Sequence, residues 1–167
     1  SEYILFFFED FIIKNKVDLN LINELFKFTK KNKVDYLKIN KFKRKLKNLS
    51  NLNSVIKVGR IPSEDIYPLP LQASIWNRNF FLKTLKFKLN PWEYEKQIKN
   101  HIELSNYKIF SIHNMNIIDY YERGLVVKGK IVKKELNFLI KNNYFLDTKM
   151  NTESFFSLFY RENVILN

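Results

Sequence analysis

The first apolar run of the chain is the feature that most constrains its fold. Residues Tyr3 to Phe8 are all aliphatic or aromatic, and the acids Glu9 and Asp10 end the run. A short, continuous run of this kind is typical of a buried strand. We therefore expect residues 3–8 to form a central strand of a sheet, with both acids at its carboxyl end.

A helix and a second strand are expected next. Asp18 is a candidate N-cap, and apolar residues recur near the helical period from Leu21 to Phe28. Lysines follow at the end of this pattern, where they suit the negative end of the helix dipole. Val34 to Ile39 are expected to form a second short strand. The order strand, helix, strand predicts a βαβ unit with parallel pairing.

The rest of the chain predicts further elements of both kinds. Polar and basic residues 41–54 are expected to form a basic loop or a short surface helix. Further strands are expected at residues 55–61, 107–112 and 116–121. Further helices are expected after residues 76–79, with Phe80, Phe81, Leu82 and Leu85 toward the core, after Asn90, and at residues 131–142 and 144–167. We expect one α/β domain over residues 1–167, built on a mixed sheet flanked by helices.

Composition narrows the classes of protein that fit. Disulfides, thiolate metal sites and a cysteine nucleophile are excluded, because the chain has no cysteine. No apolar stretch approaches the roughly 18 residues that a membrane span needs. We expect a soluble, cytoplasmic protein. The net charge of +12 fits nucleic acid, an anionic membrane surface or a phosphate-rich substrate, and equally the lysine bias of an AT-rich genome.

Two tryptophan-containing blocks are the candidates for binding and catalysis. Indole rings stack on sugar rings, while amides and carboxylates bond to sugar hydroxyls. On a helix, Glu93 and Glu95 lie two positions apart and cannot both face one cleft. The alternative places both tryptophans in the core and both acids on the surface. The candidate residues are Gln72, Trp76, Asn77, Trp92, Glu93 and Glu95.

The order of four blocks resembles bacterial surface-polysaccharide glycosyltransferases, which have the Rossmann-related GT-A architecture. The similarity covers roughly residues 3 to 140. Its most telling parts are Gln-Ala-Ser-Ile-Trp-Asn and Asn-Pro-Trp-Glu-Tyr-Glu. The four blocks are the strand that ends in Glu9-Asp10-Phe11, Leu71 to Leu82, Asn90 to Glu95, and Gly124 to Lys130.

The resemblance implies a role for each block. Glu9 and Asp10 match the Asp-x-Asp-like element that binds Mn²⁺ or Mg²⁺ and the nucleotide sugar, with Asp10 as metal ligand. Glu9 replaces the usual first Asp, which leaves metal dependence open. Either Glu93, slightly favoured, or Glu95 is the implied general base. Lys128 and Lys130 would neutralise the diphosphate. The alternative for these lysines is a hairpin that holds them in solvent.

The resemblance also has a departure. GT-A enzymes begin with a β-α-β nucleotide-binding segment before the acid pair, and nothing here supplies it. We therefore expect either a partial domain of a longer protein or a degenerate domain without transferase activity. The expected acceptor is a surface glycan or its lipid-linked precursor, with peripheral contact at the inner membrane face. The alternatives are a basic nucleic-acid-binding protein and a noncatalytic carbohydrate-binding domain.

Overall fold

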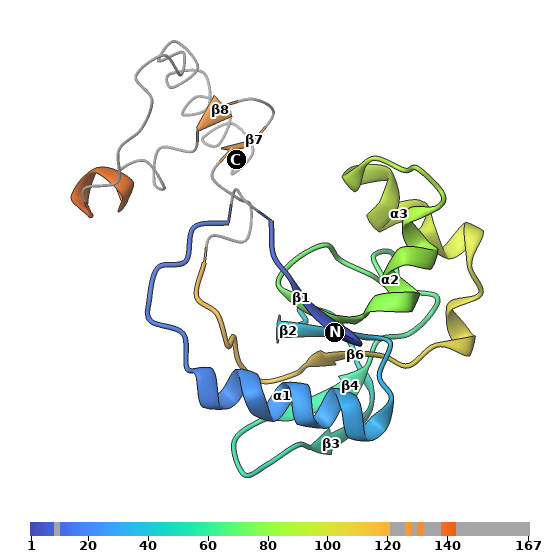
Figure 1. Ribbon diagram of the computed structural model, residues 1–167, viewed down its shortest axis with the longest axis horizontal. Coiled ribbons are helices and arrows are strands. Elements are labelled where there is room, and N and C mark those ends of the chain that lie inside the picture. The colour runs from blue at the N-terminus through green and yellow to red at the C-terminus, as the bar shows by residue number, and fades with distance from the viewer. Residues whose placement is uncertain (9–10, 121–125, 128–129, 132–137, 143–167) are drawn as a thin grey trace. The chain divides into compact units, whose positions relative to one another are not determined.

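The computed structural model describes residues 1–8, 11–120 and 138–142, and the backbone of residues 126–127 and 130–131 (Figure 1). The chain divides into two compact units, residues 1–8 with 15–119, and residues 9–14 with 120–167. The elements of the first unit are β1 (Tyr3–Phe6), α1 (Leu19–Asn32), β2 (Tyr36–Lys41), β3 (Lys47–Asn51), β4 (Lys57–Arg60), β5 (Ser74–Asn77), α2 (Arg78–Leu85), α3 (Pro91–His101), the 3-10 helix η1 (Leu104–Asn106) and β6 (Ile109–Ile112).

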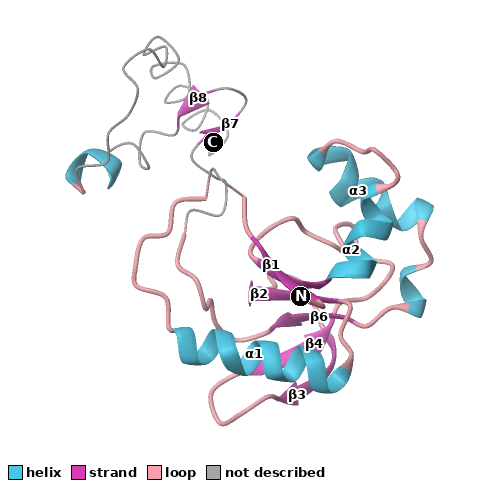
Figure 2. Cartoon of the chain, in the orientation of Figure 1, coloured by secondary structure: helices cyan, strands magenta, loops and turns pink. Residues whose placement is uncertain are grey.

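The first unit is built on a six-stranded mixed sheet (Figure 2). Its strand order is β1-β5-β2-β6-β4-β3. The pair β2–β6 is parallel, and all other neighbours are antiparallel. The expected mixed α/β arrangement is confirmed at this level.

The expected position of the first strand is wrong. β1 forms at the expected place in the sequence, but it lies at an edge of the sheet and pairs only with β5, in the register Tyr3 to Asn77. Leu5 is 46% exposed. Within the run, the ring of Phe6 packs on Phe81 of α2 at 5.4 Å and on Phe8 at 5.1 Å.

The sequence predicted that β1 and β2 pair in parallel, and this prediction is also wrong. β5 lies between β1 and β2 and is antiparallel to both, so β1 and β2 run in the same direction without touching. The parallel partner of β2 is β6, where Tyr36 pairs with Ile109. Strand, helix and strand are present as predicted, but a later strand separates the two.

Helix α1 confirms the capping prediction. The Asp18 carboxylate accepts hydrogen bonds from the backbone N–H groups of Asn20 and Leu21. Lysines lie in the last turn, and Lys33 ends the helix in the left-handed conformation with φ of 50°. The buried side chains Ile22, Leu25 and Thr29 recur every three or four residues, as expected for a helix that packs on one side.

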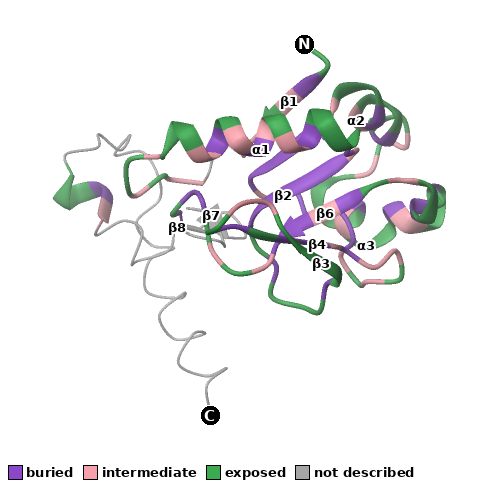
Figure 3. Ribbon diagram, turned by 90° about the horizontal axis from the view of Figure 1, so that it is seen from below, coloured by how far each residue is buried: buried purple, intermediate pink, exposed green. Residues whose placement is uncertain are grey.

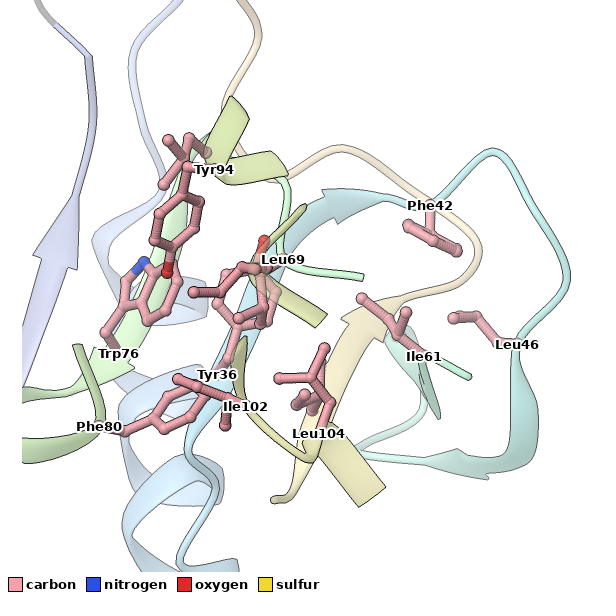
Figure 4. Close-up of a cluster of buried hydrophobic side chains, with 13 residues drawn as sticks. Tyr36, Phe42, Leu46, Ile61, Leu69, Trp76, Phe80, Tyr94, Ile102 and Leu104 are labelled. Atoms are coloured by element: carbon pink, nitrogen blue, oxygen red, sulfur yellow. The ribbon is translucent and has the colours of Figure 1, made fainter. Parts of the chain in front are cut away.

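Helices cover both faces of this sheet. On one face, Phe28 of α1 makes an edge contact with Phe110 of β6, and the Tyr3 hydroxyl donates to the carbonyl of Thr29. On the other face, Tyr36 belongs to a cluster of buried hydrophobic side chains that includes Phe80 of α2 and Tyr94 of α3 (Figure 4). Ile109 belongs to the same cluster. Adjacent strand residues point to opposite faces, so the sheet forms the middle of three layers.

Residues 41–54 differ from the expected loop or surface helix. They contain β3, the other edge strand of the sheet, and each of its five residues is exposed (Figure 3). Phe42 and Leu46, just before it, are buried. The strand escaped prediction because its residues, Lys-Asn-Leu-Ser-Asn, show no apolar alternation.

Two further expectations need correction. Of the strand expected at residues 116–121, the described residues 116–120 form only an isolated bridge at Tyr120, because the amide of Asn40 instead holds the backbone of Ile117 and Ile118. Helix α2 buries Phe80, but Leu82 and Leu85 are 46% and 48% exposed. The strands expected at residues 55–61 and 107–112 are confirmed as β4 and β6.

The second unit contains a short hairpin. β7 (Val126–Val127) pairs with β8 (Lys130–Ile131) in antiparallel fashion, which confirms the hairpin of the alternative but leaves its prediction of solvent-held lysine side chains outside the described residues. Ile131 therefore belongs to a strand, and only residues 138–141 of the expected helix at 131–142 are described as helical. Phe11 stacks on Tyr120 at 4.9 Å. The expected helical segment 144–167 lies outside the described residues.

Candidate functional site

Helix α3 begins with a reciprocal cap that uses one of the two predicted acids. The Asn90 side chain accepts a hydrogen bond from the backbone N–H of Glu93 at 3.0 Å, and the Glu93 carboxylate accepts one from the N–H of Asn90 at 3.1 Å. Pro91 occupies the first helical position, where no N–H is needed. The exposed Glu93 carboxylate thus stabilises the start of the helix.

Glu95 lies in a different environment on the same helix. Its side chain is half-buried, and its Oε1 accepts a hydrogen bond from the backbone N–H of Leu71 at 2.6 Å. Next to it, the ring of Tyr94 lies 6.5 Å from that of Trp76. The two sequence blocks that carry the family resemblance therefore pack against each other.

The surroundings of Glu95 alter its acidity. Burial raises the pKa of the Glu95 carboxyl above its ordinary value, against the opposing effects of the Leu71 N–H, Arg44 and Lys38 in that order. Desolvation disfavours the charged form of a carboxyl group. A half-buried carboxylate with a raised pKa is suited to exchange a proton with a ligand.

The charges of Arg44 and Lys38 act on the Glu95 carboxyl, and we call the three side chains the Glu95 cluster. Lys38 is 4% exposed on β2, and its ammonium donates to the carbonyls of Asn40 and Lys41 at 3.3 and 2.9 Å. Arg44 makes an ion pair with Asp65 at 2.6 Å. The cluster thus combines a half-buried carboxyl group with two cations, of which Arg44 is already paired with Asp65.

Arg44 is held by more than its ion pair. Its guanidinium lies over the rings of Phe42 and Tyr67, at 4.7 and 5.3 Å from their centroids, and donates to the carbonyl of Tyr67. These contacts fix the planar group while its side chain remains 39% exposed. Arg44 is thus a rigid cation that a ligand can reach.

The two predicted sugar-binding tryptophans have opposite environments. Trp76 is fully buried, and its indole N–H donates to the Ser74 hydroxyl at 2.8 Å. Its ring is enclosed by neighbours that include Tyr36 and Tyr94 (Figure 4). Trp76 therefore follows the core alternative and offers no ring face to a ligand. Trp92 is 72% exposed in the first turn of α3.

The two predicted amide ligands belong to the segment that contacts Glu95. Gln72 directly follows Leu71, and its side chain is half-buried. Asn77 is the N-cap of α2, where its side-chain oxygen accepts from the N–H groups of Asn79 and Phe80 at 3.0 and 3.1 Å. This capping role accounts for Asn77 in structural terms.

The predicted donor-binding residues are not among the described side chains. Glu9, Asp10 and Lys128 lie outside the described residues, and of Lys130 only its backbone in β8 is described. In the described part of the chain, no three His, Asp or Glu side chains are grouped as metal ligands. The divalent cation stays a prediction that depends on Glu9 and Asp10.

Sequence reasoning missed both cations of the Glu95 cluster. The available signals were a lysine inside the expected strand Val34 to Ile39 and the single arginine of the basic 41–54 stretch. A pocket of about 290 Å³ elsewhere includes Lys47 and Arg60 in its lining. Lys47 pairs with Glu64 at 2.5 Å, and Arg60 donates to the carbonyls of Ser105 and Tyr107, so these cations already have partners.

None of the helices in the described ranges has the length and apolar character needed to cross a bilayer. Compared with protein-family models, with curated proteins and with solved structures, the chain matches none of them.

Proposed function

We propose that this protein is a glycosyltransferase that moves a sugar from a nucleotide-sugar donor to a surface glycan or a lipid-linked glycan precursor. One observation carries the proposal. The half-buried carboxyl of Glu95, whose pKa is raised, is held by the Leu71 N–H where the two most telling blocks of the resemblance meet. A GT-A-like architecture is part of the same proposal.

Glu95 is the general base in this proposal. Its carboxylate accepts the proton of the acceptor hydroxyl while the hydroxyl oxygen bonds to the anomeric carbon and the nucleoside diphosphate departs. The sequence slightly favoured Glu93 for this role. We prefer Glu95 because the Glu93 carboxylate caps α3, whereas Glu95 is half-buried and bonded to the Leu71 N–H.

The donor side is assigned by the resemblance. Glu9 and Asp10 would hold Mn²⁺ or Mg²⁺ and the nucleotide sugar, and Lys128 and Lys130 would balance the charge of the leaving diphosphate. Gln72 and Trp92 remain the proposed contacts for sugar hydroxyls and a sugar face. The proposed place of action is the cytoplasmic side of the inner membrane, where a lipid-linked acceptor would be presented.

The first test is a thermal-shift screen of the full chain with UDP, GDP, CMP and dTDP sugars, with and without Mn²⁺ or Mg²⁺. A bound ligand stabilises the native state by about 2.7 kcal/mol at a hundredfold excess over its dissociation constant. We expect one nucleotide class to raise the melting temperature, and Asp10→Ala to abolish the rise. A rise with an oligonucleotide alone would favour the nucleic-acid alternative.

The second test separates catalysis from binding. With the donor identified, release of its nucleotide, a nucleoside diphosphate or, from a CMP sugar, CMP, is followed in a mixture of glycans and lipid-linked precursors. Glu95→Gln should abolish release while donor binding persists, and Glu93→Gln, the matched control on the same helix, should retain it. Glycan binding without donor turnover, unchanged in Glu95→Gln, would favour the noncatalytic carbohydrate-binding alternative, which the exposed Trp92 also fits.

A further inference from the structure

The pocket beside strands β3 and β4 has two cations in its wall. It has a volume of about 290 Å³, and its lining includes Lys47 and Arg60. Lys47 of β3 lies directly opposite Arg60 of β4 in the antiparallel register. Directly opposed side chains project from the same face of a sheet at close range, and like charges in such a pair repel each other. A negative charge in the pocket would relieve this repulsion.

The protein partners of these cations supply a carboxylate to Lys47 and none to Arg60. Lys47 pairs with Glu64 at 2.5 Å. Arg60 donates only through Nη2, to the carbonyls of Ser105 and Tyr107 at 3.0 and 2.9 Å. Its Nε and Nη1 bond to no acceptor in the part of the chain that the structure describes. The guanidinium is thus anchored by one nitrogen, and its other N–H groups can pair with a carboxylate or a phosphate.

A β-bulge adds Asn48 to the same pocket. Neighbouring residues of a regular strand point to opposite faces, yet Lys47 and Asn48 both line the pocket. The register of β3 and β4 shifts between Lys47 and Ser50, and Asn48 has a φ of 50°. A bulge redirects a side chain in this way, and asparagine tolerates the left-handed conformation better than most residues. Among the described residues the Asn48 amide has no hydrogen-bond partner, so it is available to a ligand.

Core packing holds this pocket in shape. A Cβ atom at Gly59, opposite the bulge, would come within 2.7 Å of Leu49 and 2.8 Å of Leu46, so glycine leaves room for both leucines. Ile61 and Leu104, which also line the pocket, belong to the buried cluster (Figure 4). The polar groups of the pocket therefore stand on a packed part of the fold, and a ligand would meet a preformed site.

We propose that this pocket binds a small hydroxylated anion, such as a phosphorylated or carboxylated monosaccharide. Arg60 and Lys47 pair with the anionic group, and the Asn48 amide and the Glu64 carboxylate bond to ligand hydroxyls. The volume lies at the lower end of the range of small-molecule sites, which limits the ligand to about one sugar unit. The inference does not depend on the proposed transferase activity, because no residue of the Glu95 cluster lines this pocket.

An NMR titration of the full chain, followed through its backbone amide signals, tests the proposal. The probes are glucose-6-phosphate and glucuronate, which carry the two candidate anionic groups, and neutral glucose as control. We expect saturable shifts of the Asn48 and Gly59 signals with at least one anionic sugar and none with glucose. The anionic sugar that binds more tightly identifies the preferred group. Failure of both anionic sugars to produce saturable shifts, or equal binding of glucose, would overturn the proposal.

Matched variants locate the binding. Arg60→Gln should weaken anion binding about tenfold or more, because a hydrogen bond between charged groups is lost. Arg78→Gln makes the same change at an exposed arginine of α2 and should bind as wild type does. Asn48→Asp keeps a residue that tolerates the left-handed conformation, but its negative charge should likewise weaken binding. Asn51→Asp, on the same strand but outside the lining, should not. Wild-type binding by either pocket variant, or an equal loss in a pocket variant and its control, would refute the assignment.

Discussion

At the scale of single residues, the two tryptophans predict opposite results. Trp76→Ala should lower the free energy of unfolding by about 3–5 kcal/mol, because it removes a large, fully buried ring. Trp92→Ala should change it by no more than about 0.5 kcal/mol, since that ring is 72% exposed. Urea titrations followed by far-UV circular dichroism measure both. A small loss in Trp76→Ala would contradict the core role of this ring.

Glu95 predicts a pH dependence of stability. Burial, the largest influence, raises its pKa in the folded protein above that of the unfolded chain. The native state is therefore stabilised when the carboxyl is neutral. This stabilisation is fully present at pH values below the pKa of Glu95 in the unfolded chain, and it is lost as pH rises through the pKa in the folded protein. The free energy of unfolding of wild type should fall relative to Glu95→Gln as pH rises from about 4.

Urea unfolding of both proteins across a pH series measures this difference. Gln keeps an oxygen that can accept the hydrogen bond from Leu71, so the variant removes the ionisation and preserves the contact. Glu93→Gln removes one negative charge from the exposed cap of the same helix and serves as control. If the free energy of unfolding of wild type instead rose relative to that of Glu95→Gln as pH increases, the assigned effect of burial would be contradicted.

Single-residue prediction from the sequence succeeded where the cause is local. Asp18 was identified as a cap, and the start of a helix was expected after Asn90, because a helix start depends on residues within one turn. The Glu95 cluster was not identified, since Lys38, Arg44 and Glu95 come from β2, the segment after it and α3. No spacing rule relates side chains that only the folded sheet brings together.

At the scale of elements, the cap of α3 predicts a measurable contribution. Asn90→Ala should lower the free energy of unfolding by about 1 kcal/mol, because it leaves the N–H of Glu93 without its acceptor. Gln97→Ala, at an exposed position within the same helix, is the matched control and should cost less than about 0.5 kcal/mol. Thermal or urea unfolding compares them, and equal effects would show that the cap contributes little.

Elements with strong periodicity were predictable, and their partners were not. α1, β4, α3 and β6 lie close to their expected positions. The sequence placed the apolar β1 at the centre, yet β5 takes the place beside β2. A continuous apolar run indicates that its side chains are buried, but it does not indicate what buries them. Here Phe81 of helix α2 packs on Phe6, so β1 needs no second neighbouring strand.

At the scale of the whole molecule, the net charge of +12 predicts a response to salt. Repulsion among like charges destabilises a compact state. The screening length falls from about 30 Å at 0.01 M to about 8 Å at 0.15 M ionic strength. Added sodium chloride in this range should therefore raise the free energy of unfolding, as urea titration can measure. A decrease would mean that attractive pairs such as Arg44–Asp65 outweigh the repulsion.

The mixed α/β class of the whole molecule followed from the alternation of apolar runs and helical periods. The strand order did not, because it is set by contacts between segments far apart in the sequence. The GT-A-like architecture and the transferase function remain proposals, supported by sequence blocks and by the contact of Glu95 with Leu71.

The pairing of β1 with β5 has a consequence for synthesis of the chain. Tyr3 pairs with Asn77, so the first strand leaves the ribosome long before its partner exists. At about 5–20 residues per second, the interval is on the order of 4–15 seconds. During this time a nascent segment rich in phenylalanine has no strand to pair with. Chaperones that bind extended apolar peptides would find their target there, and slower translation would lengthen that exposure.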